Sequence, residues 1–400
     1  MATSCARPSS PPPRVRASKV ETRPRFRYFV HCCLLGGLDS IYTTNPKRSA
    51  DVESWVPVPY SPNEIVSTPT GYLAPAYAPL APISNRLAIL QNVAVQTVSH
   101  EYGKRQFFRA RHDINQQVPW LADIVGESIR DTQAVSLLLI GSSGGTPDTS
   151  PGLVTAFRAN NSGLLKSIEA LNEEEALVLA RSLRDVAQRN VGRTASSYAQ
   201  AAALIERVRR APRFKPEPWV EGLDKKTTEV QTSLQQAVWA IQNDIAASVA
   251  LFSEPLVVDS HANNDAVQSR DNLQFAKIFA RFIQELERRK NVHGSLIDQT
   301  LGVFGSELGR FPRLNDRLGK DHWPEAPSVL FGGSVKPGIY GDTDRRMAAV
   351  PVDMRTGLPD RNGEYLDLEH VGSTVLTAAG LPGAPYGYSR PGLSFALRSS

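Results

Sequence analysis

The segment Gly305–Trp323, GSELGRFPRLNDRLGKDHW, contains several side chains that could bind ions: Glu307, Arg310, Lys320, Asp321 and His322. Carboxylate oxygens and imidazole nitrogens are common ligands of divalent cations. The guanidinium of Arg310 fits a tetrahedral oxyanion bidentately, whereas Lys320 would act as a point charge. For Lys320 alone, a solvated loop position is the favoured interpretation. The segment follows the apolar run TLGVF, so we expect it to begin where a strand ends.

Asp259 and His261 form a second pair at the end of the apolar run EPLVV. Residues two apart in an extended chain point to the same side, so a carboxylate oxygen and an imidazole nitrogen could hold one cation. Taken alone, the pair is better explained by Asp259 capping the next turn while His261 packs. Asp39 follows another apolar run, FRYFVHCCLLGGL. Because burying several acids near one point is costly without a cation, the acids together favour a metal site.

Two hydroxyl groups and an imidazole follow the apolar run RLAILQNVAV. A hydroxyl at a strand-to-helix turn could be an activated nucleophile, with Thr97 and Ser99 as the candidates and His100 beside them. Capping of a helix by Ser99 is the competing explanation. His112 could face the same cleft or pair with its neighbour in sequence. Three other histidines are expected to be structural: His31, His293 and His370.

These residues need a scaffold, and six apolar runs supply one. The predicted strands cover residues 26–38, 86–95, 134–140, 254–261, 299–307 and 327–333. Their apolar residues are continuous rather than alternating, which indicates burial on both faces and hence a largely parallel sheet. Ligands of such sheets bind beyond the carboxyl ends of the strands, where the acids and histidines stand.

The intervening segments are predicted to be helical. Residues 272–290 carry apolar side chains at spacings of three and four, with Asp271 as the expected N-cap. Residues 162–211 and 227–247 also have a helical pattern, without a strand between them. We therefore predict an α/β protein with a helical insertion near residues 160–250.

The charge distribution separates a leader from the rest of the chain. Net charge is +5, yet residues 1–30 hold seven basic residues against one acid, so the remainder is close to neutral. Nucleic acid is accordingly a poor default partner. Residues 1–26 are predicted to form a disordered, Pro- and Ser-rich leader, and residues 27–400 a single domain.

The three cysteines do not suggest a disulfide framework, because two of them are adjacent, so a reducing compartment is favoured. The run YFVHCCLLGGL is too short to span a bilayer. It resembles a weak signal-peptide core but lacks a small-residue cleavage site. The expected location is cytoplasmic, with export to the periplasm as the alternative.

The order of motifs resembles the bacterial family called domain of unknown function 1501, a branch of the alkaline phosphatase and sulfatase superfamily. The resemblance covers roughly residues 27–390 and is carried by LLGGLDS, AILQNVAVQTVSHEYG, VVDSH, TLGVFGSELGRFP, GKDHWP and VLFGGSVKPGIYGDTD. It implies the α/β/α sandwich of those metallohydrolases, whose chemistry is attack on a phosphate or sulfate ester held by divalent cations.

The resemblance also implies roles for individual residues. Asp39 matches the metal-binding acid after the first strand, and Asp259 with His261 resembles the mid-chain metal pair. Glu307 stands where the superfamily usually has Asp, and His322, with Asp321 beside it, resembles the late metal histidine. Leu308 occupies the position of a further expected histidine, and the motifs assign no nucleophile.

Two functions are compatible with these features. The first is a metal-dependent hydrolase of a small anionic phosphate or sulfate ester, in which zinc, calcium, magnesium or manganese polarises the ester, Arg310 stabilises negative charge and Thr97, Ser99 or water attacks. The second is a catalytically inactive binding or scaffold relative, favoured by Leu308 and by the lack of an obvious nucleophile. The sequence identifies neither the ion nor the oligomeric state.

Overall fold

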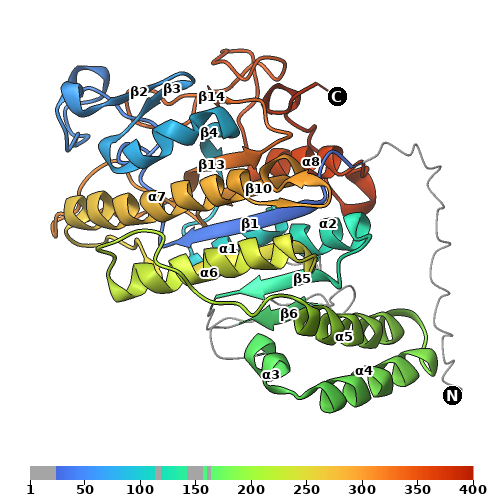
Figure 1. Ribbon diagram of the computed structural model, residues 1–400. Coiled ribbons are helices and arrows are strands. Elements are labelled where there is room, and N and C mark those ends of the chain that lie inside the picture. Colours follow the sequence, from blue (N-terminus) through green and yellow to red (C-terminus); the bar gives the residue numbers. More distant parts are fainter. Residues whose placement is uncertain (1–23, 113–118, 142–155, 160–163, 400) are drawn as a thin grey trace, which may run out of the picture.

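The protein is built around a twisted sheet, shown in Figure 1. The computed structural model describes residues 24–112, 119–141, 156–159 and 164–399, so most of the predicted leader lies outside the described residues. Eight strands of the described part form one sheet in the order β14 (Gly338–Tyr340), β4 (Leu87–Ala94), β13 (Glu325–Gly332), β10 (Thr300–Gly305), β1 (Tyr28–Leu35), β7 (Ala246–Val257), β5 (Val135–Ile140) and β6 (Ala156–Ala159).

The sheet is largely parallel, as predicted. β13 runs antiparallel to its neighbours β10 and β4, whereas each other neighbouring pair in the sheet is parallel. All eight residues of β1 are buried. Its alternate side chains enter two different cores, because successive residues of a strand point to opposite faces. The continuous apolar runs therefore reflect burial of the sheet on both sides.

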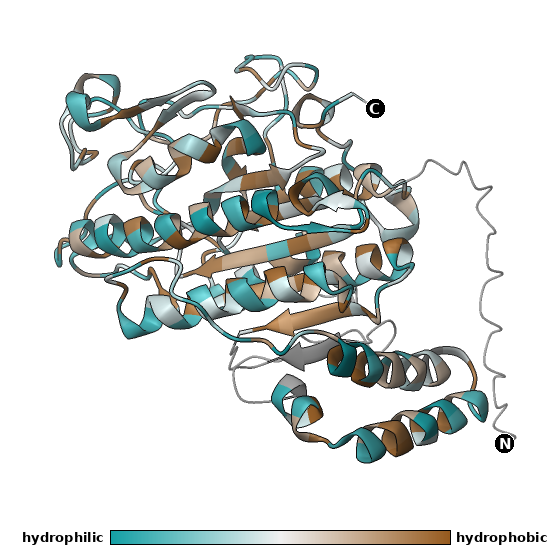
Figure 2. Cartoon of the chain, viewed as in Figure 1, coloured by the Kyte–Doolittle hydropathy of each residue, from teal (hydrophilic) through white to brown (hydrophobic). Residues whose placement is uncertain are grey.

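Helices cover both faces and complete an α/β/α sandwich. On one face, α6 (Lys225–Gln242) and α7 (Asn264–Arg288) lie in front of the sheet in Figure 1 and share a core with Val30 and Leu34 of β1. On the other, α1 (His100–Arg109), α2 (Leu121–Ile129) and α8 (Leu368–Ala378) pack with Phe29 and Leu35. Figure 2 shows the matching pattern, with β1 and β5 mostly hydrophobic and α7 mixed. The predicted fold class is confirmed.

The segment predicted to be helical before α6 contains α3 (Leu164–Ala170), α4 (Glu173–Gln188) and α5 (Gly192–Arg210). Asn172 caps α4 through a reciprocal pair of hydrogen bonds with Glu175. β6 lies just before these helices at the edge of the sheet, and α6 packs on the sheet itself. The proposed domain boundaries stay a prediction.

Two predicted boundaries are wrong. β7 begins at Ala246, eight residues earlier than expected, and takes over the end of the segment predicted to be helical. Its first part, AASVALF, is a short apolar run, which periodicity alone cannot assign to helix or strand. α7 begins at Asn264 after Asn263, so Asp271 lies inside the helix and is not its N-cap. The polar first two turns of α7 carry no apolar stripe that could have shown its start.

Short two-stranded pairs lie outside the main sheet in the described part of the chain: β2 (Val66–Thr68) with β3 (Gly71–Leu73), β8 (Lys290–Asn291) with β9 (Gly294–Ser295), and β11 (Gly309–Arg310) with β12 (His322–Trp323). None of the helices in the described ranges is long and apolar enough to cross a membrane. The β11–β12 pair follows β10 directly and carries residues of the site described next.

Candidate metal centre

Chain segments at the carboxyl ends of three central strands bring the predicted site residues together. Asp259 follows β7, Glu307 follows β10, and His100 begins the helix after β4. These three strands point the same way, so their ends meet at one edge of the sheet. In the β11–β12 pair, Arg310 stands opposite His322, which returns that histidine to the same edge.

His100, Asp259 and His322 form a cluster with the spacing of a metal site. One ligand atom from each lies within 4.8 Å of those of the other two, a grouping that stands alone among the described residues. Nε2 of His100 is 3.4 Å from Oδ2 of Asp259, and Nε2 of His322 is 3.8 Å from Oδ1. A carboxylate and two imidazoles are therefore available to one ion.

The partners of His322 determine which nitrogen faces the cluster. Its Nδ1 lies 2.6 Å from the carbonyl oxygen of Val98. A carbonyl can only accept, so Nδ1 carries the proton and Nε2 presents its lone pair to Asp259. Burial is the main cause that lowers the pKa of His322, and the charge of Arg310 adds to it. The ring is thus held neutral, the form that a metal requires.

His100 is oriented by a buried carboxylate. Its Nδ1 lies 2.7 Å from Oε1 of Glu307, a fully buried residue. The same oxygen accepts a hydrogen bond from the backbone of Gly36 at 2.8 Å, and Oε2 accepts one from the hydroxyl of Ser306 at 2.9 Å. Hydrogen bonds to Asp259 and to Glu307 raise the pKa of His100 to about 9. Glu307 therefore stands behind the histidine, the position of a carboxylate that supports a metal ligand.

Arg310 forms an ion pair with the carboxylate of Asp259. Its Nη2 lies 2.6 Å from Oδ1 of Asp259 and also donates to the carbonyl of Gly36, while Nη1 donates to the carbonyl of Lys320 at 2.9 Å. Burial by itself would raise the pKa of Asp259, but the hydrogen bond to His100 and the charge of Arg310 outweigh it and lower the pKa. The side chain of Arg310 is fully buried, so it fixes the carboxylate and supplies charge from the protein side.

His261 adds a third imidazole at the rim of the cluster. Its Nε2 lies 2.8 Å from Nε2 of His322 and 3.4 Å from Oδ1 of Asp259. Its Nδ1 faces Oδ1 of Asp321 at 3.2 Å, and Asn315 hydrogen-bonds the same carboxylate. Those hydrogen bonds, from Asn315 and then from His261, lower the pKa of Asp321.

The donor set fits a cation. Each of the three imidazoles turns Nδ1 toward a group that accepts hydrogen bonds, namely Glu307, Asp321 or the carbonyl of Val98. Each then points Nε2 at the carboxylate of Asp259. Lone pairs of His261 and His322 that face each other at 2.8 Å repel unless a proton or a cation lies between them. A divalent ion would relieve this repulsion.

Asp39 has a different cationic partner. Nζ of Lys320 lies 2.7 Å from Oδ2 of Asp39, Asn264 donates to the same oxygen at 3.2 Å, and the backbone of Ile41 donates to Oδ1. Lys320 is completely buried, so its interpretation as a solvated loop residue is wrong. Its ammonium balances the charge of Asp39, which is not among the three residues whose ligand atoms meet; ion binding by Asp39 stays a prediction.

The two candidate nucleophiles, Thr97 and Ser99, stand three positions and one position before His100. In the described part of the chain neither hydroxyl hydrogen-bonds to a residue of the cluster. Ser99 occupies the N-cap position of α1 without a capping side-chain hydrogen bond, and Thr97 accepts a hydrogen bond from the backbone of Ser99 at 3.2 Å. Within the described residues, neither hydroxyl bonds to an imidazole, so the nucleophile stays a prediction. His112 lies elsewhere, 3.8 Å from Asp367.

Two features of the site were not evident from the sequence. The carbonyl of Val98 has no side-chain signature, and its role depends on the return of β12 to this edge. Asn315 lies in the loop segment whose charged residues were predicted to bind ions. Its amide side chain, four residues before Gly319 and six before Asp321, was the available signal.

The structure thus defines an α/β sandwich with a candidate metal centre at the carboxyl ends of its strands. The model of the family described as protein of unknown function (DUF1501) matches residues 184–378 of the chain. The matched region includes Asp259, His261, Glu307 and His322, whereas His100 precedes it. No curated protein sequence matches the chain.

Several solved structures are similar to this one at low identity. The lipoteichoic acid synthase LtaP from Listeria monocytogenes is 10% identical, with a TM-score of 0.38, and the match covers 90% of this chain and 73% of that one. A mutant of the alkaline phosphatase PafA is 11% identical, with a TM-score of 0.35 and coverages of 73% and 64%. A 2-O GAG sulfatase is 10% identical, with a TM-score of 0.34 and coverages of 90% and 71%.

Proposed function

We propose that the protein is a metal-dependent hydrolase of a small phosphate or sulfate ester. The observation that carries this proposal is the convergence of His100, Asp259 and His322 on one point, with the fully buried side chain of Arg310 paired to Asp259. Imidazole and carboxylate ligands suit zinc or manganese better than calcium, which prefers oxygen alone. When bound, such an ion would polarise the ester and stabilise developing negative charge.

The residues around the candidate metal centre would have separate roles in binding and catalysis. Arg310 fixes Asp259, and Glu307 fixes His100, so two ligands are oriented before an ion arrives. His261 has a side chain that is 37% exposed and lies at the rim, where it would complete the ligand set or hydrogen-bond the ester. Thr97 or Ser99 would supply the nucleophile from the start of α1, with water as the alternative.

The second candidate function is binding of an ion or an anion without catalysis. The buried pair of Lys320 and Asp39 favours it, because the charge of that carboxylate is already balanced by the protein. The buried Leu308 gives the same indication at a position where a ligand was expected from the family resemblance. Both functions share the candidate metal centre and differ in turnover.

Metal analysis of the purified protein, combined with assays on aryl phosphates and aryl sulfates, tests the proposal. We expect about one divalent ion per chain and measurable hydrolysis of one substrate class. His322→Ala should lose both, whereas His293→Ala, which alters an exposed histidine outside the centre, should lose neither. Bound metal without turnover of any ester would favour the binding function. Unchanged metal content in His322→Ala would contradict the candidate centre.

A further inference from the structure

A cavity of about 300 Å³ lies far from the candidate metal centre. It is bounded by residues 212–219, which connect α5 to α6, by the last turns of α6 and by Arg289 directly after α7. α6 ends just before β7 begins, whereas Asp259 follows the other end of that twelve-residue strand. At about 3.3 Å per residue, roughly 40 Å of strand separates the two places. The cavity is therefore independent of the metal centre.

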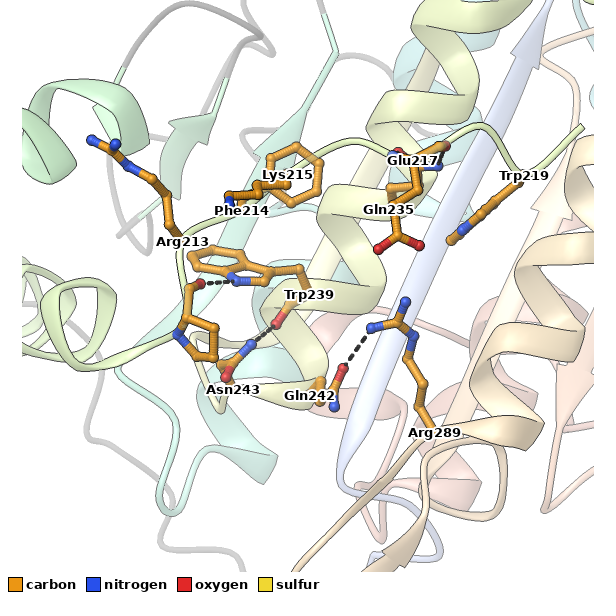
Figure 3. Close-up of a pocket in the computed structure, with 11 residues that line it drawn as sticks. Arg213, Phe214, Lys215, Glu217, Trp219, Gln235, Trp239, Gln242, Asn243 and Arg289 are labelled. Atoms are coloured by element: carbon orange, nitrogen blue, oxygen red, sulfur yellow. Dashed lines mark hydrogen bonds between the residues drawn. The ribbon is translucent and has the colours of Figure 1, made fainter.

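Aromatic rings form much of the wall. Figure 3 shows Phe214 and Trp239 on one side of the cavity and Trp219 on the other. The rings of Phe214 and Trp239 meet edge to face, with centroids 6.1 Å apart. Flat, polarisable faces of this kind bind a planar apolar group, with a gain beyond simple burial of area.

Cations exceed acids among the lining residues. Arg213, Lys215 and Arg289 face one carboxylate, that of Glu217. Arg213 is paired with Glu169 at 3.4 Å, and Nε of Arg289 donates to Glu285 at 2.9 Å. Lys215 is exposed, and its ammonium has no ion-pair partner among the described residues. Arg213 and Arg289 thus have acidic partners of their own, and Lys215 is the cation of the lining that would be available to an anion.

Hydrogen bonds from α6 form the cavity before any ligand binds. Gln235 accepts from the backbone of Glu217 at 3.2 Å and donates to its carbonyl, and Gln231 accepts from the backbone of Val220 at 3.0 Å. The indole of Trp239 donates to the carbonyl of Pro212 at 2.8 Å. Both glutamines are buried, so the connecting segment is anchored at several points. A ligand would not need to order this wall, which lowers the entropic cost of binding.

We propose that this cavity binds a small anionic ligand that contains a flat ring. The ring would pack against Trp219 and Trp239, and the anion would pair with the ammonium of Lys215. The volume is at the lower end of the range for small-molecule sites, which suits a ligand of one or two fused rings. The aromatic wall and the ammonium of Lys215 support different parts of the same ligand.

Calorimetric titration with naphthalene-2-sulfonate tests the proposal. Its sulfur is bonded to carbon, so a phosphate or sulfate ester hydrolase cannot consume it. The comparison compounds are 2-naphthol, which has the ring but is uncharged at neutral pH, and inorganic sulfate, which has the charge without the ring. We expect the sulfonate to bind at least about tenfold more tightly than either. It gains a charge-assisted hydrogen bond relative to 2-naphthol and the packing of the ring relative to sulfate, and each contributes about that factor. If inorganic sulfate binds as tightly as naphthalene-2-sulfonate, the ring does not contribute to binding and the proposal of a ring-containing ligand is wrong.

Matched variants locate the binding. Lys215→Gln and Trp219→Leu should each weaken sulfonate binding by about tenfold, whereas Lys225→Gln, an exposed lysine outside the cavity, should leave it unchanged. His322→Ala should also bind the sulfonate normally, which separates this proposal from the fate of the metal centre. Equal binding by the Lys215→Gln and Lys225→Gln proteins would overturn the proposal.

Discussion

Nδ1 of His100 lies 2.7 Å from Oε1 of Glu307, although the two residues are 207 positions apart in the chain. The acid was predicted to contact an ion directly, but its carboxylate lies against the far nitrogen of a histidine whose Nε2 faces the cluster. We infer from this arrangement that Glu307 would be a positioning residue; direct ion binding by Glu307 stays a prediction. The arrangement also explains why a carboxylate can stay buried at this place, since it accepts hydrogen bonds from Gly36 and Ser306 as well.

Glu307→Gln tests that role. The amide keeps the size of the side chain but removes the charge that orients His100, so affinity for the divalent ion should fall by about 10–100-fold. Competition with a fluorescent chelator measures this affinity, and a melting curve controls for folding. His322→Ala should lose affinity more completely, because it removes a ligand atom. A Glu307→Gln protein with unchanged metal affinity would show that Glu307 has no part in the centre.

The buried pair of Lys320 and Asp39 should be a large contributor to stability. Lys320→Met leaves the carboxylate of Asp39 buried without its charge partner, which should cost about 3–5 kcal/mol of unfolding free energy. Urea denaturation gives this value. Adding Asp39→Asn should recover much of the loss, because it removes the stranded charge. If the double variant is no more stable than Lys320→Met alone, the two residues do not stabilise each other.

The metal-free protein should become less stable as pH rises through the range 6.5–9. The pKa of His100 is raised to about 9 by its hydrogen bonds to Asp259 and Glu307, against an ordinary value near 6.5. A raised pKa means that the folded state binds the proton more tightly, so this stabilisation is complete below pH 6.5 and is lost on passing pH 9. Melting temperatures in the presence of a chelator measure the effect. His100→Asn should flatten the dependence of melting temperature on pH in this range. An equally steep dependence in that variant would show that His100 is not the titrating group.

Gly103 sets how closely α1 approaches the centre. A Cβ atom at this position would overlap the carbonyl oxygen of Glu307, so Gly103→Ala must push α1 away from the end of β10. Alanine normally stabilises a helix interior by about 1 kcal/mol relative to glycine. Here we expect lower thermal stability and weaker metal binding, since His100 begins the same helix. Glu101→Ala, an exposed change on α1, is the control. A stabilised Gly103→Ala protein with full metal affinity would contradict this packing argument.

Much of this protein follows from local sequence. Continuous apolar runs such as that of β1 predict strands buried on both faces, because neither face can then meet water. The same logic predicted that acids and histidines after such runs would gather at one edge, and Asp259, Glu307 and His322 do so. The start of β7 could not be predicted, since a short apolar run satisfies helix and strand equally.

The tertiary structure decided which partner each of these residues has. Asp39 and Glu307 are both acids that follow buried strands, yet one is neutralised by Lys320 and the other orients His100. Sequence spacing fixes the end of the sheet at which a side chain lies. Whether that side chain meets an ion, an ammonium or an imidazole depends on loops that return from distant parts of the chain, as the β11–β12 pair does with His322. Hydrogen bonds and ion pairs act over about 3–4 Å, so their partners are set by three-dimensional packing and not by order along the chain.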